Sequence, residues 1–261
     1  MKALQIAAAG MSAQQMRVEV ISNNLANMST TGYNARRAEF ADLQYEQVTR
    51  PGTLTSTSGT MVPAGIQVGM GVRPASVSVM LAQGPLTQTN GDLDIAIDGG
   101  GYLEITLPSG ISAYTRDGSL KRSPEGQIVT SEGYPLVPDI TIPEDARSIS
   151  INANGEVFAY FSDRVEPENL GQITLASFIN EKGLEAIGSN MFLESTASGT
   201  PRVASPGQEG LGTIRAGWLE ESAVDPVREI AELIKAQRGY ELNSKVISAA
   251  DQMLGTTVQV R

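Results

Sequence analysis

The sequence predicts an α+β protein, with long N- and C-terminal helices forming a coiled-coil-like assembly domain and a mainly antiparallel β domain between them. Apolar residues recur every seven positions near both ends of the 261-residue chain. The middle lacks this period and alternates short apolar runs with turn pairs such as Asp117-Gly118 and Asn154-Gly155. Aromatic residues make up only 5% of the chain, so a core must be built from aliphatic side chains.

The N-terminal helix is predicted over residues 3–28, within an assembly segment of residues 1–30. Its heptad pattern has two rows, at Leu4, Met11, Val18 and Leu25, and at Ala7, Gln14, Ile21 and Met28. This narrow apolar stripe is typical of a helix that pairs with another helix, and Gln14 is its polar break. Asn23, Asn24 and Asn27, followed by Thr31 and Gly32, are suited to ending the helix.

The C-terminal helix is predicted over residues 225–258, within an assembly segment of residues 224–261. Asp225-Pro226 supplies an N-cap and a proline at the first helical position. The heptad row consists of Leu233, Tyr240, Ile247 and Leu254, with Ile230, Ala236, Ala250 and Val258 beside it. Gly239 interrupts the helix at a cost of about 1 kcal/mol.

Two segments separate the helices. Residues 31–71 are predicted as an extended arm or loop, which includes the insertion 49–65, rich in Thr, Ser, Gly and Pro. Such a composition cannot build its own core. Residues 72–223 are predicted as a β-rich outer domain.

Charge and composition exclude several function classes. The chain has no cysteine, which excludes a cysteine nucleophile and a zinc-thiolate site, and no histidine, which is the commonest general base and the commonest metal ligand. The net charge is −10, and residues 85–200 carry 17 acidic and 6 basic residues, whereas residues 225–261 carry five of each. An acidic protein without a basic stripe is a poor nucleic-acid binder. We therefore expect no catalytic or metal site, no cofactor, no nucleic-acid partner and no small-molecule substrate.

Two local patterns suggest binding loops but have simpler interpretations. Asp92, Asp94 and Asp98 lack the ligand spacing of an EF-hand, so we interpret them as turn and strand-edge acids. Gly99-Gly100-Gly101 is followed by neither a Lys-Ser/Thr pair nor an expected helix, so we interpret it as a turn. Met1 to Ala13 faintly resembles a signal peptide, but Gln5 interrupts its apolar stretch, and we interpret it as the start of the helix.

A long helix with a narrow apolar stripe needs a packing partner to be stable. For each end helix the partner is the other end of the chain, other copies of the chain, or both. Contacts between copies that do not close into a ring would give a filament. Periodicity alone leaves open a globular α+β domain with two docked helices.

Motifs at both ends resemble the terminal signatures of flagellar rod, hook and hook-associated proteins. They are Ser22-Asn23-Asn24-Leu25-Ala26-Asn27 with Thr30-Thr31-Gly32-Tyr33, and Gln237-Arg238-Gly239-Tyr240-Glu241-Leu242-Asn243-Ser244-Lys245. Ser22 and Gly239 stand where family members commonly have Ala. The middle resembles the shared β domain of the longer family members, through residues 83–89, 93–99 and 114–119. The resemblance covers essentially the whole chain.

The resemblance implies a structural subunit of the flagellar distal rod, which polymerises into a helical tube and transmits torque to the hook. A proximal-rod subunit of similar length and a hook subunit are the alternatives within the family. It implies as partners other copies of the chain, proximal rod subunits, the hook protein, the surrounding P and L rings and the export apparatus. It places the protein in the basal-body rod that crosses the periplasm, exported without a cleaved signal peptide. The insertion 49–65 is expected to stiffen the rod.

The predicted assembly residues combine the heptad rows with the two signatures. They are Leu4, Met11, Val18, Ile21, Asn23, Asn24, Leu25, Asn27, Thr31, Gly32, Ile230, Leu233, Gln237, Arg238, Tyr240, Asn243, Ile247 and Leu254. Two alternatives of other classes are a rod-associated peptidoglycan hydrolase that would use carboxylates such as Glu166 and Glu168, and a secreted binding module.

Overall fold

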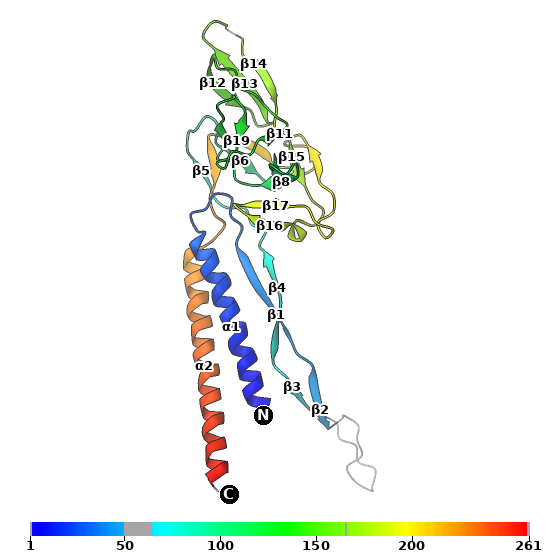
Figure 1. The fold of residues 1–261 in the computed structure, drawn as a ribbon, viewed down its shortest axis with the longest axis vertical. Coiled ribbons are helices and arrows are strands. Elements are labelled where there is room, and N and C mark those ends of the chain that lie inside the picture. Colours follow the sequence, from blue (N-terminus) through cyan, green and yellow to red (C-terminus); the bar gives the residue numbers. More distant parts are fainter. Residues whose placement is uncertain (1, 50–63, 165, 260–261) are drawn as a thin grey trace. The chain divides into compact units, whose positions relative to one another are not determined.

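The computed structural model describes residues 2–49, 64–164 and 166–259, and the chain folds as two compact units (Figure 1). The helix unit comprises Met1–Leu25, Arg36–Ser78 and Asp225–Arg261. The β unit comprises Ala26–Ala35 and Val79–Val224. The predicted combination of two terminal helices and a mainly antiparallel β middle is confirmed.

The helix unit contains helices α1, Lys2–Ala26, and α2, Pro226–Gln259, which lie side by side and antiparallel (Figure 1). Both predicted helices form within two residues of their expected ends. The start of α2 follows from its cap, because a carboxylate oxygen of Asp225 accepts hydrogen bonds from the backbone N–H groups of Val227 at 3.0 Å and Arg228 at 3.3 Å. Among the described residues, no helix is long and apolar enough to cross a membrane.

A two-part β ribbon completes the helix unit. Strand β1, Arg36–Asp42, pairs with β4, Val72–Val79, and β2, Tyr45–Thr49, pairs antiparallel with β3, Ile66–Gly69. The ribbon contacts α1 at Gly71, where an added Cβ would lie 3.3 Å from the Cβ of Ala9. The predicted arm therefore contains paired strands, while its insertion, apart from residues 49, 64 and 65, lies outside the described residues.

The β unit is built from short strands and one 3-10 turn, η1, Glu181–Gly183. The strands are β5 Leu86–Gln88, β6 Ile95–Asp98, β7 Tyr102–Thr106, β8 Ser112–Thr115, β9 Lys121–Arg122, β10 Ile128–Val129, β11 Leu136–Val137, β12 Ala146–Ile151, β13 Glu156–Phe161, β14 Glu168–Gln172, β15 Leu175–Ser177, β16 Glu185–Gly188, β17 Met191–Leu193, β18 Arg202–Ala204, β19 Thr213–Ala216 and β20 Trp218–Glu220.

The largest sheet has the order β16-β17-β8-β7-β15-β18, with β11 paired to β7. A second sheet has the order β12-β13-β14, and the remaining pairs are β19-β6, β20-β5 and β10-β9. All the strand pairs described in the β unit are antiparallel. Neighbours in the sheets are often distant in sequence, so the unit closes on itself through non-local pairing.

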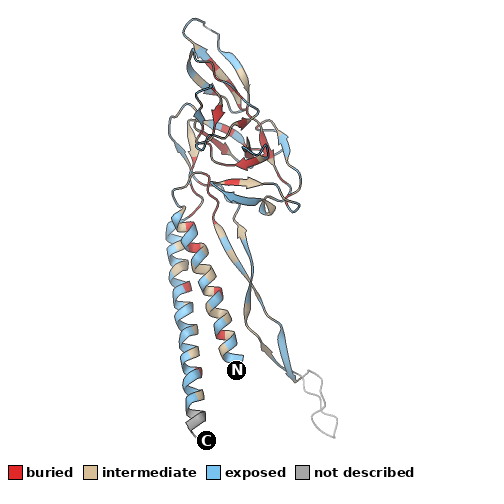
Figure 2. Cartoon of the chain, in the orientation of Figure 1, coloured by how far each residue is buried: buried red, intermediate tan, exposed pale blue. Residues whose placement is uncertain are grey.

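The core of the β unit is aliphatic, as the composition predicts. Leu103, Ile105 and Leu175 are fully buried in the main hydrophobic cluster. Figure 2 shows that buried residues gather in the strands of the β unit. Tyr114 and Phe178 form a smaller aromatic cluster, with ring centroids 4.8 Å apart in an edge-to-face arrangement. Because these side chains are buried within the unit, the β unit has a hydrophobic core of its own.

Candidate assembly surface

Two reciprocal glycine notches fix the register of α1 against α2. Gly10 of α1 faces Asn243 of α2, and a Cβ at Gly10 would lie 2.8 Å from the Asn243 Nδ2. Gly239 of α2 faces Gln14 of α1, and a Cβ there would lie 3.1 Å from the Gln14 Cδ. The polar break in the first heptad pattern and the glycine in the second are thus two halves of one contact. The buried Oε1 of Gln14 has no hydrogen-bond partner among the described residues.

Charged side chains join the two helices further along the same antiparallel register. Arg17 of α1 forms an ion pair with Glu232 of α2, which also accepts a hydrogen bond from Lys235 at 2.7 Å. The hydrogen bond from Lys235 and the nearby Arg17 guanidinium hold the pKa of Glu232 below its usual value. Solvent-accessible pairs of this kind contribute little stability.

Asn24 connects three elements of the helix unit. Its amide exchanges hydrogen bonds with the backbone of Arg36 in β1, donating to the carbonyl at 2.8 Å and accepting from the N–H at 2.9 Å. It also donates to Glu229 of α2 at 3.2 Å. Asn24 is buried, so this signature residue acts inside its own chain. Asn23 is exposed, and Asn27 is half-buried and accepts from the Thr30 hydroxyl at 3.2 Å.

The two helices place their predicted heptad rows differently. On α1, Ile21 is buried and Leu4, Met11, Val18 and Leu25 are half-buried. On α2, Leu233, Asn243, Ile247 and Leu254 are half-buried, and Ile230, Gln237, Arg238 and Tyr240 are exposed. Among the α2 residues whose burial the structure describes, the buried ones are Ala236 and Ala250, with Asn243 midway between them. The line that packs on α1 is therefore the small-residue row, and the predicted row lies on its flank.

This small-residue line is the feature that the sequence reasoning underrated. Ala236, Asn243 and Ala250 repeat every seven residues, three positions after the apolar row that starts at Leu233. The period alone does not separate the two rows. The small side chains and the facing glycines are the signal that distinguishes them, since close approach of two helices requires small residues.

Beside this line, α2 leaves apolar side chains and a hollow at the surface. Val227 is 78% exposed and Leu242 is 62% exposed, and Ile234 and Val246 are also exposed. A hollow of about 380 Å³ lies in the groove between the helices. It is lined by Gln15, Val18, Gln237, Tyr240 and Glu241. Exposed apolar side chains and a hollow on one helix pair are features that are typical of a protein-binding surface.

The other half of the N-terminal signature lies in the β unit. The backbone N–H of Gly32 donates to the carbonyl of Glu220 at 2.8 Å, and Asn190 donates to the Thr31 carbonyl at 2.6 Å. Gly32 has φ +66°, and a Cβ there would lie 2.9 Å from the Arg116 carbonyl oxygen. Thr31 and Gly32 are therefore held by hydrogen bonds within the β unit. Position 32 requires a glycine because its φ is positive and because the Arg116 backbone lies too close for a Cβ.

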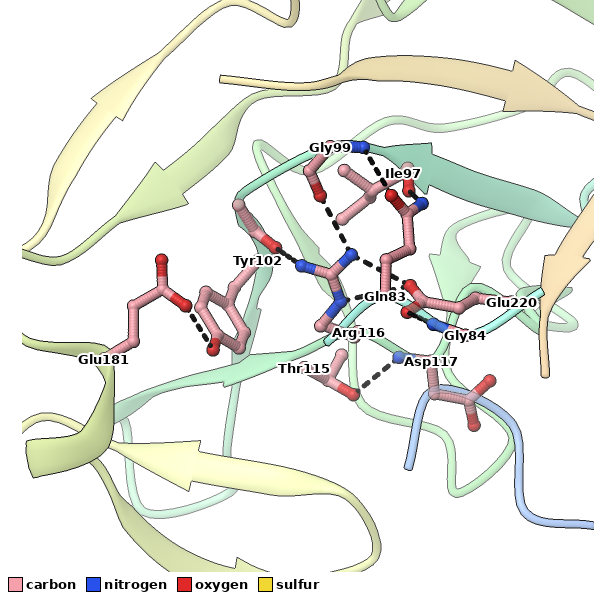
Figure 3. A network of polar contacts seen from close by, with 11 residues as sticks. Gln83, Gly84, Ile97, Gly99, Tyr102, Thr115, Arg116, Asp117, Glu181 and Glu220 are labelled. Atoms are coloured by element: carbon pink, nitrogen blue, oxygen red, sulfur yellow. Dashed lines mark hydrogen bonds and ion pairs between the residues drawn. The ribbon is translucent and has the colours of Figure 1, made fainter. Parts of the chain in front are cut away.

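Arg116 and Glu220 form a buried ion pair in the β unit (Figure 3). The Arg116 guanidinium donates to one carboxylate oxygen of Glu220 at 2.9 Å and 3.0 Å, and the other oxygen accepts from the Gly84 N–H at 3.0 Å. Arg116 also donates to the carbonyls of Gly99 and Gly101, each at 3.0 Å. The glycine turn thus presents carbonyl oxygens to a cation, which is the opposite of a phosphate loop.

Tyr102 extends this network towards the surface. Its ring lies 5.8 Å from the Arg116 guanidinium, and its hydroxyl donates to Glu181 at 3.2 Å (Figure 3). Burial raises the pKa of Tyr102 well above its usual value, and the neighbouring Glu181 carboxylate adds to that effect. The 83–89, 93–99 and 114–119 segments singled out in the sequence meet in this region. Glu220 lies outside all three, so no local pattern identified it as the partner of Arg116.

Three of the five carboxylates considered for metal binding or hydrolysis have other partners. Asp98 forms an ion pair with Arg215 at 2.6 Å, and Asp94 accepts from the Thr89 hydroxyl at 2.6 Å. Glu168 pairs with Arg164 at 3.3 Å on an exposed strand. Within the described parts of the chain, no three potential ligands among His, Cys, Asp and Glu come together to hold a metal.

Comparison with known proteins covers both units. Residues 4–34 match the model of the flagella basal body rod protein family, residues 96–159 match the flagellar hook protein FlgE/F/G D1 domain, and residues 215–260 match the flagellar basal body rod FlgEFG protein C-terminal domain. The flagellar basal-body rod protein FlgG of Caulobacter vibrioides is 52% identical, with all of both chains aligned.

Two further relatives extend this similarity. FlgG of Borreliella burgdorferi is 46% identical over 98% of this chain and 97% of its own. FlgG of Agrobacterium fabrum is 44% identical over 97% of each chain. Because the identity extends over both helices and the β unit, this protein belongs to the FlgG family of flagellar basal-body rod proteins.

Proposed function

We propose that this chain, a structural subunit of the flagellar rod and not an enzyme, assembles through its helix unit into a helical tube. The proposal depends chiefly on one observation: α2 carries a row of half-buried and exposed apolar side chains beside the line that packs on α1. Neighbouring copies that cover this row would gain the burial that a single copy lacks.

The charge distribution supports the same arrangement. Residues 225–261 carry five acidic and five basic residues, so copies of this segment can approach without net repulsion. The acid-rich middle lies in the β unit, where it would favour solubility on the outside of a tube. A coiled-coil-like packing of the terminal helices is the form of assembly that we propose.

The predicted assembly residues have two kinds of role in this proposal. Exposed positions such as Ile230, Gln237 and Tyr240 would contact neighbouring copies. Buried positions such as Asn24 and Gly32 would act indirectly, by positioning the elements of their own unit. We retain the functional division into residues 1–30, 31–71, 72–223 and 224–261 as part of the proposal.

The position within the flagellum is proposed more finely as the distal rod. There the subunit would transmit torque to the hook and contact proximal rod subunits, the hook protein, the P and L rings and the export apparatus. It would cross the periplasm and be exported without a cleaved signal peptide. Residues 49–65 would stiffen the rod, so their deletion should give a measurably more bendable filament.

Electron microscopy of basal bodies after an in-frame deletion of the gene tests the position. A short proximal rod without a hook is the result expected of a distal-rod subunit. A complete rod lacking only its hook would reassign the chain to the hook, and normal flagella would contradict the proposal. A separate test of polymerisation is to assemble the purified chain and to monitor rod formation by light scattering.

A further inference from the structure

The helix pair carries an apolar ridge in addition to the hollow. Leu242, Val246 and Ala249 are exposed on α2 at spacings of four and three residues, which places them on one face of the helix. We name this set the α2 ridge, and the groove lined by Gln15, Val18, Gln237, Tyr240 and Glu241 the Tyr240 hollow. Both features belong to the helix unit.

The ridge and the hollow face different directions. At 3.6 residues per turn, the centre of Gln237, Tyr240 and Glu241 lies roughly 150° around α2 from the ridge. Helix α1 lies between them, against Asn243, on the line that also carries the buried Ala236 and Ala250. The ridge of one copy therefore cannot fill the hollow of the same copy, and both remain available to other molecules.

We propose that the α2 ridge of one copy docks into the Tyr240 hollow of the next copy, an inference that rests on the proposed function as a rod subunit. The hollow measures about 380 Å³, which exceeds the ~30 Å³ of one water molecule by enough to admit aliphatic side chains. Val18 and the Tyr240 ring supply its apolar lining. The glutamine amides and Glu241 form a polar rim.

The occupant is a second copy for two reasons. The α2 segment carries balanced charge, with five acidic and five basic residues in 225–261, so an oppositely charged partner has nothing to recognise. The aliphatic ridge that suits the hollow lies on the same helix, and a copy whose hollow is filled still offers its own ridge on the far flank. Such a contact is heterologous and repeats without closing, as a filament requires.

Disulfide trapping tests the contact directly, since the natural chain has no cysteine. Val246→Cys and Gln15→Cys variants are mixed under assembly conditions and oxidised. We expect a covalent dimer that contains one copy of each variant, because docking would bring the two Cα atoms within about 7 Å. Gln5→Cys, another exposed glutamine on α1 that lies outside the hollow, is the matched control and should give no such dimer with Val246→Cys.

A second experiment separates ridge and hollow by mixing defective copies. Val246→Glu would place a charge on the ridge, and Gln237→Trp would fill the hollow, with circular dichroism confirming that each variant keeps its helices. Each variant alone should need at least about tenfold more protein to assemble, because an unpaired charge resists burial and a filled hollow excludes the ridge. Mixed together, they should form dimers through their one intact contact and no filaments.

The outcomes distinguish this inference from the proposed function. Two results would overturn the ridge-and-hollow contact and leave the rod function standing. One is that the Val246→Cys and Gln15→Cys variants form rods without a disulfide between them. The other is that the Val246→Glu variant forms rods as well as the natural chain does. Disulfide dimers of Val246→Cys with itself would show ridge-to-ridge pairing and also overturn it. Failure of the natural chain to assemble at any concentration would contradict the proposed function as well.

Discussion

The helix unit and the β unit differ in how completely each buries its apolar side chains. In the β unit, Leu103, Ile105 and Leu175 are fully buried, and a buried arginine has a buried carboxylate partner. In the helix unit, Leu242 is 62% exposed, and the helices meet along alanines and glycines. The β unit is thus complete within one copy, whereas the helix unit retains apolar surface for other copies.

The largest effect is expected from breaking the buried ion pair. Arg116→Ala would leave the Glu220 carboxylate buried without its partner and should lower the free energy of unfolding of the β unit by about 3–5 kcal/mol. Arg215→Ala, which removes the exposed pair with Asp98, is the matched control and should cost about 1 kcal/mol or less. Urea denaturation measures both, and equal losses would contradict the contrast between buried and exposed pairs.

A smaller loss is expected from a cavity in the aliphatic core. Leu175 is fully buried, so Leu175→Ala should cost about 2–5 kcal/mol. Leu242→Ala deletes the same atoms from an exposed position and should change the stability of the unassembled chain by about 0.5 kcal/mol or less. A large loss in the single copy from Leu242→Ala would show that the ridge is already packed before assembly.

The N-cap of α2 offers an intermediate effect in the helix unit. Asp225→Ala removes the acceptor for the Val227 and Arg228 N–H groups and should cost about 1 kcal/mol. Asp225→Asn keeps an acceptor while removing the charge, so it should restore most of that loss. Thermal unfolding followed by circular dichroism distinguishes them, and equal losses would assign the effect to charge and not to the cap.

The glycine notch should give a small but informative coupling. Gly239→Ala gains helix propensity but displaces the Gln14 side chain, so its net effect should be close to zero. Combined with Gln14→Ala, the same change should gain about 1 kcal/mol relative to Gln14→Ala alone. Gly255→Ala, where an added Cβ meets nothing within 4 Å, is the control. Strict additivity of the two substitutions would contradict the notch.

The buried tyrosines should have the smallest effect on stability at neutral pH. Their effect on the free energy of unfolding is expected to appear only at alkaline pH. Burial raises the pKa of Tyr114 from 10.0 to about 12 and also raises that of Tyr102. Because the folded state disfavours the phenolate, this contribution is complete below pH 10 and is lost as the pH rises towards 12. Urea midpoints at pH 9 and pH 11 should therefore diverge, and less so for Tyr114→Phe; an unchanged divergence would assign it to other groups.

Local sequence patterns were sufficient for the helices and for the class of the middle region. The seven-residue periods and the Asp225-Pro226 cap define α1 and α2 within two residues, because these signals act over a few turns of one segment. Turn pairs and the scarcity of aromatics indicated an aliphatic β unit. The terminal signatures indicated the family that the full-length comparisons then showed.

Only the tertiary structure decided which surfaces face inward. A heptad period fits both the Leu233 row and the Ala236 row of α2. The close approach at Gly10 and Gly239 favours the row of small residues, which begins at Ala236, as the row that packs against α1. Arg116 and Glu220 are separated by 104 residues, so their pairing depends on how the strands close and not on local sequence. The sequence by itself determined the elements and their apolar surfaces, because propensity and period are local. The pairing of those surfaces was decided by the tertiary structure, because packing joins residues that are distant along the chain.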